Sequence, residues 1–142
     1  MSRTTLILAA AFLVTCLAAP GAVAQTGDAM DGGPVFEMRT YTAHPGRLDA
    51  LMRRFRDHTT RIFEKHGMVN VGYWVPTDEP LSENTLVYIL SYPSREAATE
   101  AWAAFRSDPE WSRVSEESQR DGAIVESVES VFMDATDFSA IR

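Results

Sequence analysis

The stretch FEMRTYTAHPGRLDALMRRFRDHTTRIFEKHG, Phe36–Gly67, predicts one β-strand followed by one long helix. The strand is predicted over 35–42 and ends before Pro45-Gly46, because the residue preceding a proline is pushed out of the helical region and a glycine eases a turn. From Leu48 to His66 the apolar side chains recur three and four residues apart, as on one side of an amphipathic helix. A strand that leads into such a helix predicts a helix packed on a sheet.

The rest of the chain predicts three more strands and two more helices. The strands are expected over 68–75, 84–92 and 123–133, and the helices begin at the N-cap residues Ser94 and Asp108. The order is β-α-β-β-α-β with one extra short helix before the last strand. This order predicts an α+β fold, a ferredoxin-like βαββαβ sandwich with its helices on one face of the sheet. Because the strands are apolar on both faces, the second face needs a cover, and a second copy packing sheet to sheet makes a homodimer.

The N-terminal segment is predicted to be an export signal. Residues 1–24 contain one charge, Arg3, an apolar run from Leu6 to Ala19 and the small residues Ala22-Val23-Ala24, which together predict a cleaved signal peptide. The run is shorter than the roughly 20 residues of a membrane-spanning helix, so no membrane span is expected. The domain plan is a signal peptide over 1–24, a glycine-rich leader over 25–34 and one domain over 35–142. We therefore expect an exported protein, periplasmic or secreted, with a lipoprotein anchored at Cys16 as the alternative.

Composition narrows the classes of partner. The formal net charge is -7, and it becomes -8 when removal of residues 1–24 takes away Arg3 and no acidic residue. A protein this acidic is not expected to bind nucleic acid or an anionic membrane. The basic residues of the first helix, Arg53, Arg54, Arg56 and Arg61, are predicted to form a solvated helix face.

The first strand carries the candidate site. Alternation along a strand places Phe36, Met38 and Thr40 on one face and places the polar set on the other, namely Glu37, Arg39 and Tyr41. We expect the first set to face the helices and the polar set to point into the space between the two sheets of a dimer. A charge enclosed there must be paired or must bind something, because an unpaired buried charge costs several kcal/mol.

Two interpretations of this polar set stay open. In the functional one, Arg39 anchors an anionic or enolate oxygen and Glu37 orients the arginine, while Tyr41, Trp74 and Tyr88 line the pocket and supply a proton donor. The candidate catalytic residues are then Arg39, Tyr41 and His44, and the candidate ligand-binding residues are Glu37, Arg39, Tyr41, Trp74 and Tyr88. In the structural one, the Glu37–Arg39 pair fixes strand register and dimer geometry, and the aromatic residues are core.

Other kinds of site find little support in the sequence. His58 and His66 lie two turns apart on the helix and the only cysteine is Cys16, so no metal site is predicted. No glycine-rich phosphate loop is present, and no cofactor is predicted. His66 is expected to bond to the end of its helix, and Trp102, Phe105 and Trp111 are expected to be core residues because they recur at helical spacing.

Several motifs together resemble one known family across Phe36–Ser139. They are Glu-x-Arg-x-Tyr in the first strand, Pro45-Gly46, Phe-Glu-Lys-His-Gly around His66, Gly72 with Trp74, Tyr88, Trp-x-x-Phe at Trp102 and Phe105, and Asp108-Pro109-x-Trp111. In these features the chain resembles the NIPSNAP family, which belongs to the dimeric α/β barrel group. The resemblance implies a homodimer, and related barrels include cofactor-independent monooxygenases and small lactone isomerases. We therefore predict that the protein binds a small apolar or aromatic molecule in the inter-sheet cavity. It does so either as a binding protein or as an enzyme of the cofactor-independent monooxygenase or isomerase type. The alternative is a non-enzymatic structural or interaction protein with a side-chain-filled barrel.

Overall fold

The computed structural model describes residues 33–142, so the predicted signal peptide, Cys16 and most of the leader lie outside the described residues. The elements are β1 (Val35–Ala43), α1 (Leu48–Arg54), η1 (Phe55–Thr59), α2 (Thr60–Lys65), β2 (Val69–Trp74), η2 (Leu81–Glu83), β3 (Thr85–Tyr92), α3 (Arg95–Arg106), α4 (Pro109–Ser118) and β4 (Val125–Asp134). The predicted order of strands and helices is confirmed, including the extra helix α4 before the last strand.

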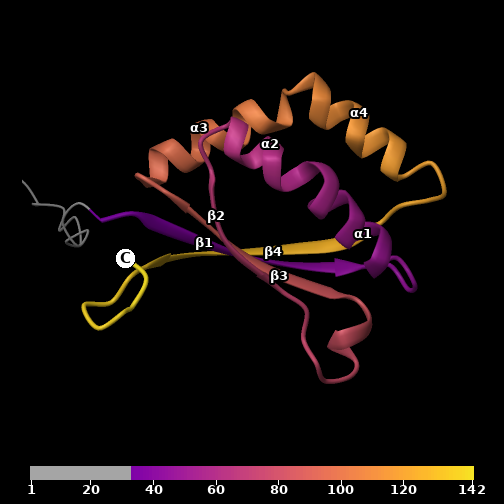
Figure 1. Ribbon diagram of the computed structural model, residues 1–142, viewed down its shortest axis with the longest axis horizontal. Helices are drawn as coiled ribbons and strands as arrows, with labels where there is room; N and C mark the ends of the chain where they lie inside the picture. The colour runs from indigo at the N-terminus through magenta and orange to yellow at the C-terminus, as the bar shows by residue number, and fades with distance from the viewer. Residues whose placement is uncertain (1–32) are drawn as a thin grey trace, which may run out of the picture.

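The four strands form one sheet in the order β2-β3-β1-β4, and every neighbouring pair is antiparallel. The helices lie together on one side of this sheet (Figure 1). The order of the elements along the chain and the single layer of helices on the sheet give an α+β fold that is consistent with the predicted ferredoxin-like sandwich. No helix among residues 33–142 is long and apolar enough to cross a membrane.

The first helix is interrupted by one wide turn. The regular apolar spacing predicted one unbroken α-helix, but η1 is a π-helical turn between α1 and α2. The backbone N–H of Thr60 donates to the carbonyl of Phe55, five residues back, and the buried hydroxyl of Thr59 donates to the carbonyl of Arg54 at 3.1 Å. π-Helical turns are rare in proteins, but those that occur are often found at functional sites. The residues next to this turn are therefore candidates for a functional role.

The last two helices begin as predicted. The Ser94 hydroxyl accepts a hydrogen bond from the backbone N–H of Ala97, and the Asp108 carboxylate accepts one from the N–H of Glu110, ahead of Pro109 at the first helical position. Each cap satisfies a backbone donor that the helix itself leaves without a partner.

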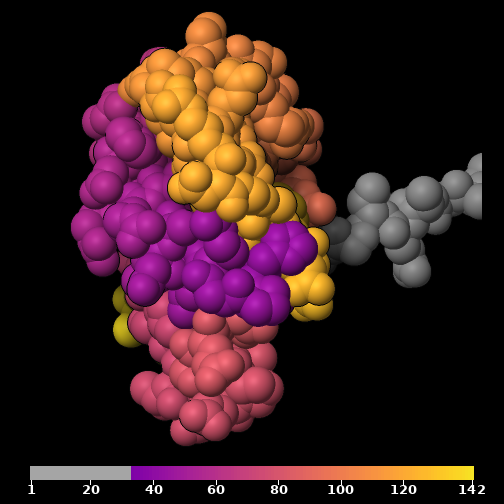
Figure 2. Space-filling view, turned by 90° about the vertical axis from the view of Figure 1, so that its right-hand side faces the viewer, coloured from indigo at the N-terminus to yellow at the C-terminus, as the bar shows by residue number. Residues whose placement is uncertain are grey.

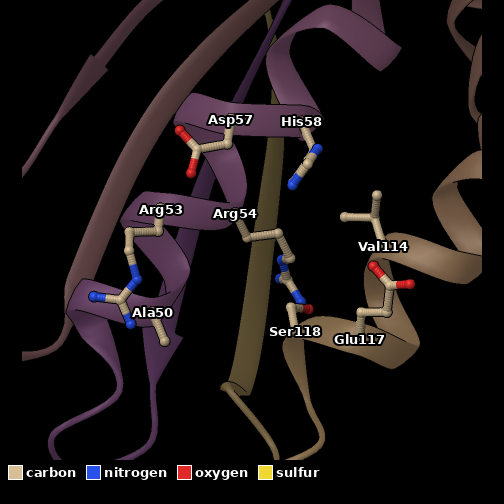
Figure 3. A pocket seen from close by; sticks show the side chains of 8 residues that line it. All are labelled: Ala50, Arg53, Arg54, Asp57, His58, Val114, Glu117 and Ser118. Atoms are coloured by element: carbon tan, nitrogen blue, oxygen red, sulfur yellow. The ribbon is translucent and has the colours of Figure 1, made fainter.

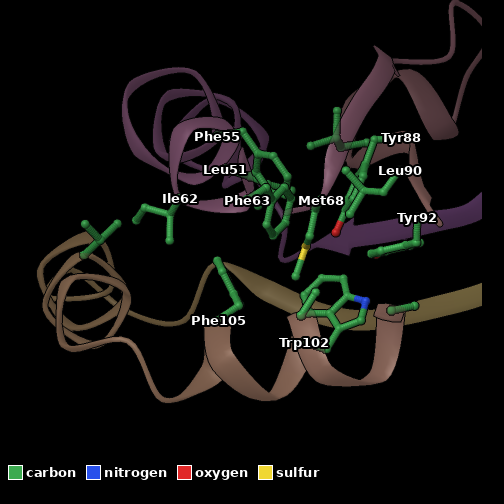
Figure 4. Packing of buried hydrophobic residues seen from close by; sticks show 14 of the residues in the cluster. Leu51, Phe55, Ile62, Phe63, Met68, Tyr88, Leu90, Tyr92, Trp102 and Phe105 are labelled. Carbon is green, nitrogen blue, oxygen red and sulfur yellow. The ribbon is translucent and has the colours of Figure 1, made fainter. Parts of the chain in front are cut away.

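The core lies between the helices and the sheet (Figure 4). Phe63 is at its centre, because its ring packs against Phe55 of η1, Tyr88 of β3, and Trp102 and Phe105 of α3. Trp102 and Phe105 are buried, which confirms their predicted core role. Trp111 is half-buried against Phe105, with ring centroids 4.5 Å apart.

The prediction of which set of β1 side chains faces the helices is wrong. The two sets alternate as expected, but the polar set, Glu37, Arg39 and Tyr41, lies on the helix side. Glu37 accepts a hydrogen bond from the indole of Trp102 on α3, and Tyr41 packs against Phe55 of η1. Hydrophobicity could not assign the faces because both are rich in apolar residues. The buried indole and phenol donors on the helix side require an acceptor, and Glu37 supplies it.

The opposite face of the sheet has no helix over it. Met38, Ile89 and Val131 are neighbours across three strands there, and Trp74 and Val131 remain about half exposed, at 52% and 51%. Residues from the C-terminal segment cover one end and leave an apolar pocket of about 280 Å³, lined in part by Phe36, Val71, Ile89, Met133 and Ile141. The folded chain therefore has an apolar sheet face without helices over it, which is the face that the sequence predicts to need a cover.

Candidate functional site

The Glu37 carboxylate is the most fully paired polar group in the core. Its side chain is 1% exposed. Four donors reach it at 2.6 to 2.7 Å: Trp102 Nε1, Tyr92 Oη, Ser130 Oγ and Arg39 Nη1. Burial raises the pKa of Glu37, but these hydrogen bonds outweigh burial and hold the pKa below the usual glutamate value. Glu37 is therefore an ionised carboxylate that positions its neighbours, and no lone pair is left to act as a base.

Arg39 is held in place on two sides. Its Nη1 donates to Glu37 at 2.7 Å, and its guanidinium carbon lies 4.2 Å from the ring centroid of Trp102 and 5.7 Å from that of Tyr41. Burial lowers the pKa of Arg39, but Tyr88, Tyr41 and Glu37 raise it above the usual arginine value. Its Nε is buried and has no hydrogen-bond partner among the described residues. Arg39 thus presents a fixed cation whose Nε–H is buried and unpaired.

Tyr88 lies beside Arg39 and Tyr41 in the same layer. Its side chain is fully buried, its ring centroid is 5.3 Å from that of Tyr41, and its hydroxyl has no hydrogen-bond partner among the described residues. Burial raises the pKa of Tyr88 well above the usual tyrosine value. The phenol is therefore neutral at physiological pH and can donate its proton to an oxygen or nitrogen acceptor.

Arg54 is a second buried cation that sequence reasoning missed. It was predicted on a solvated helix face, yet it is 6% exposed, its Nε has no partner among the described residues, and its guanidinium carbon lies 5.4 Å from the ring centroid of Trp111. Burial lowers the pKa of Arg54, while Tyr41 and Tyr88 raise it. The sequence holds no signal for this placement, because burial comes from α4, which packs over the flank of the first helix.

Three of the four buried side-chain atoms that lack a partner among the described residues belong to this region: Arg39 Nε, Arg54 Nε and Tyr88 Oη. Both arginines lie near enough to Tyr41 and Tyr88 for these phenols to shift their pKa. Unpaired buried polar groups are rare in folded proteins and call for a specific explanation. Here the unpaired donors come from β1, α1 and β3 and lie near the phenols of Tyr41 and Tyr88, so this region is the candidate site for an oxygen-bearing ligand.

Two predicted site residues lie elsewhere. His44 is in the turn after β1, where its backbone N–H donates to the carbonyl of Ile124 at 2.9 Å, and its side chain has no hydrogen bond within residues 33–142. Trp74 lies on the opposite face of the sheet, over Gly72, where an added Cβ would come within 2.6 Å of the indole. The structure therefore brings together Glu37, Arg39, Tyr41 and Tyr88, and leaves His44 and Trp74 outside the group.

A pocket of about 270 Å³ opens between the first helix and α4, next to the buried arginine (Figure 3). It is lined by Ala50, Arg53, Arg54, Asp57, His58, Val114, Glu117 and Ser118. Figure 2 shows the end of the molecule where α4 and the β1–α1 turn reach the surface above the β2–β3 loop. Arg54 is thus shared between this pocket and the layer of phenols below it.

A separate polar cluster joins the end of the first helix to the start of α4. Asp108 accepts hydrogen bonds from Lys65 Nζ and pairs with His66 Nε2, both at 2.7 Å, and a further ion pair links Arg61 to Glu110. His66 therefore has a structural role, as predicted, although its partner is Asp108, the N-cap residue of α4, and not a carbonyl of its own helix.

This cluster predicts loss of stability in acid. Lys65, His66 and the backbone N–H of Glu110 hold the pKa of Asp108 well below its usual range. Because the folded-state pKa is the lower one, the stability from Asp108 is present above the unfolded value of about 3.9 and is lost as pH falls through the folded-state pKa. We expect the free energy of unfolding, measured by urea denaturation, to stay level from neutral pH to about pH 5 and to fall below about pH 4. Asp108→Asn should flatten this fall, and the exposed Asp121→Asn should leave it unchanged.

Comparison with known proteins points to one family. The NIPSNAP family model matches residues 36–140. A NIPSNAP family protein of unknown function from Agrobacterium tumefaciens has a similar crystal structure, with a TM-score of 0.68 and 26% sequence identity over 79% of this chain and 96% of that chain. An uncharacterized NIPSNAP-like domain protein from Burkholderia xenovorans has a TM-score of 0.65 and 19% identity over 75% of this chain and 88% of that chain, which shows the shared fold alone. No curated protein matches the chain.

Proposed function

This chain belongs to the NIPSNAP family, and from that premise we propose that it binds a small organic molecule through an acidic or carbonyl oxygen in the layer between sheet and helices. The observation that carries the proposal is the unpaired Tyr88 hydroxyl beside the unpaired Nε of Arg39, both buried and both next to Tyr41. The aromatic rings around them suit an aromatic or apolar body on the ligand.

The same geometry supports a catalytic form of the proposal. A fixed guanidinium beside a neutral phenol is an arrangement that stabilises an enolate oxygen as charge develops on it. Glu37 then serves as the positioning residue that holds Arg39 in place, because all of its acceptor capacity is used by the four donors. A cofactor-independent isomerase or monooxygenase would act in this way on the bound molecule.

Replacing Tyr88 by phenylalanine separates binding from folding. Because the hydroxyl has no partner within residues 33–142, its removal should leave the free energy of unfolding unchanged or raised. Affinity for a phenolic probe, 4-hydroxybenzoate, should fall about three- to tenfold in isothermal titration. Tyr73→Phe is the matched control, because Tyr73 stacks on the same ring but its hydroxyl already donates to Asn70. Equal binding by wild type and Tyr88→Phe would count against the proposal.

Export and a homodimer complete the proposed function. We propose that the uncovered sheet face packs against a second copy, because Met38, Ile89 and Val131 form an apolar surface across three strands. Ile89→Asp places a charge at the centre of this surface and should convert a dimer to a monomer in light scattering after size exclusion. Ala103→Asp, on the exposed side of α3, should leave the dimer intact. A wild-type chain that is monomeric at all concentrations tested would rule the dimer out.

Cleavage after Ala24 is checked by mass spectrometry of the mature N-terminus.

A non-enzymatic structural or interaction role is the second candidate. The observation that favours it is the complete pairing of Glu37, which ties β1 to β3, β4 and α3 without any ligand. Under this alternative, no retained small molecule is found by native mass spectrometry of the protein from its own host, and wild type and Tyr88→Phe bind 4-hydroxybenzoate equally weakly. A small molecule retained by wild type and lost from Tyr88→Phe supports the first candidate instead.

A further inference from the structure

The pocket between the first helix and α4 has the character of a separate binding site. Its volume of about 270 Å³ is just below the range of about 300 to 1,000 Å³ that small-molecule pockets span. Only a compact ligand fits it. The residues that line it come from α1, η1 and α4, so it lies on the helix layer and not on the sheet.

Arg54 is the feature that points to a ligand. Its side chain is more than nine-tenths buried, it lines the pocket, and it extends from α1 toward Ser118 of α4 (Figure 3). None of the ion pairs within residues 33–142 includes Arg54. The contact with Trp111 offsets part of the cost of burying the charge, but a buried guanidinium is normally matched by an anion.

The other charged side chains of the pocket favour a ligand that carries a single negative charge. One further guanidinium, Arg53, and two carboxylates, Asp57 and Glu117, line the same pocket, so the acids outnumber the remaining guanidinium. Glu117 already pairs with Arg113, outside the pocket, at 2.9 Å. A doubly charged phosphate would be repelled by these acids, whereas a carboxylate carries one charge and matches the planar fork of a guanidinium with two parallel hydrogen bonds.

We propose that this pocket binds a small monocarboxylate, whose two oxygens pair with the guanidinium of Arg54 between α1 and α4. The π-helical turn begins at the next residue, Phe55, and the Thr59 hydroxyl holds the Arg54 carbonyl, so the backbone that carries the arginine is fixed on both sides. The site goes beyond the proposed function, because it needs neither Arg39 nor Tyr88 and does not require a ligand beside them.

The test is a titration of the isotope-labelled mature chain with sodium lactate, followed by NMR. Backbone amide signals of Ala50, Arg54 and Val114 should shift and saturate together, and lactamide, the uncharged analogue, should leave them in place. Inorganic phosphate should bind more weakly than lactate. Absence of saturable shifts with lactate, equal binding of lactamide or tighter binding of phosphate would each overturn the proposal.

Variants place the ligand on Arg54 without depending on one substitution. Arg54→Lys keeps a charge but loses the fork, and should weaken lactate binding at least about tenfold. Ala50→Glu puts a carboxylate four residues before Arg54 on the same helix, where it can occupy the guanidinium, and should abolish binding; Ala50→Gln, of the same size without the charge, should retain it. Arg56→Met removes an exposed arginine outside the pocket and should change nothing. Undiminished binding by Ala50→Glu with its fold intact would refute the site.

Discussion

Glu37→Leu is expected to lower the free energy of unfolding by about 3–5 kcal/mol, the cost of removing one partner of a buried ion pair. The substitution leaves the largely buried Arg39, whose side chain is 18% exposed, without its carboxylate. It also leaves the indole N–H of Trp102 and the hydroxyl of Tyr92 without an acceptor. Because a domain of this size has about 5–15 kcal/mol of stability in total, the variant should be close to unfolding at room temperature. Urea denaturation followed by circular dichroism measures the change.

Two further variants test whether the pairing of Glu37, and not its volume, causes the loss. Glu37→Gln keeps an oxygen acceptor but turns the other oxygen into a donor that faces donors, so its loss should be smaller than that of Glu37→Leu and still above 1 kcal/mol, since an unsatisfied buried group costs about 1–3 kcal/mol. Glu129→Gln, at an exposed position of β4, should stay within about 0.5 kcal/mol of wild type. If Glu37→Leu cost no more than Glu129→Gln, the network would be incidental to folding.

Phe63→Ala is expected to cost about 3–5 kcal/mol because it opens a cavity at the centre of the core. Phe63 is 1% exposed and its ring contacts those of Phe55, Tyr88, Trp102 and Phe105. The loss should appear as a lower urea midpoint with an unchanged slope. Phe138→Ala is the matched control, because that ring is 85% exposed and its removal should change stability by less than about 0.5 kcal/mol. A Phe63→Ala midpoint equal to that of wild type would show that the core is packed differently.

Much of the fold followed from local pattern. The strands start and end within about two residues of the predicted limits, and the caps at Ser94 and Asp108 are where the residue types placed them. These features depend on near neighbours in the chain, which a sequence displays directly. The π-helical turn was not foreseen, because an apolar residue at Phe55 and another at Ile62 fit either kind of turn.

The candidate site was predicted in part. Glu37, Arg39, Tyr41 and Tyr88 do lie together, because cross-strand register follows from alternation once β1 pairs with β3. Their placement on the helix side could not be inferred, since it depends on Trp102 and Tyr92, which approach from more than 50 residues away. The burial of Arg54 could not be inferred for the same reason. Which flank of a helix a later helix will cover is a property of tertiary packing and leaves no mark on local composition.

The wide turn at η1 has a consequence for how this chain can change in length. The turn holds the two halves of the helix at angles that a regular helix of the same length would not give. Loss of one residue from 55–59 would restore the regular spiral and rotate α1 by about 100° against α2, since each residue advances a regular helix by that angle. Arg54 would then turn away from α4 while Ile62 and Phe63 kept their places in the core. Leu51, which is fully buried in the core, would turn with Arg54, so the wide turn is what allows the two halves of one helix to bury their own side chains at the same time.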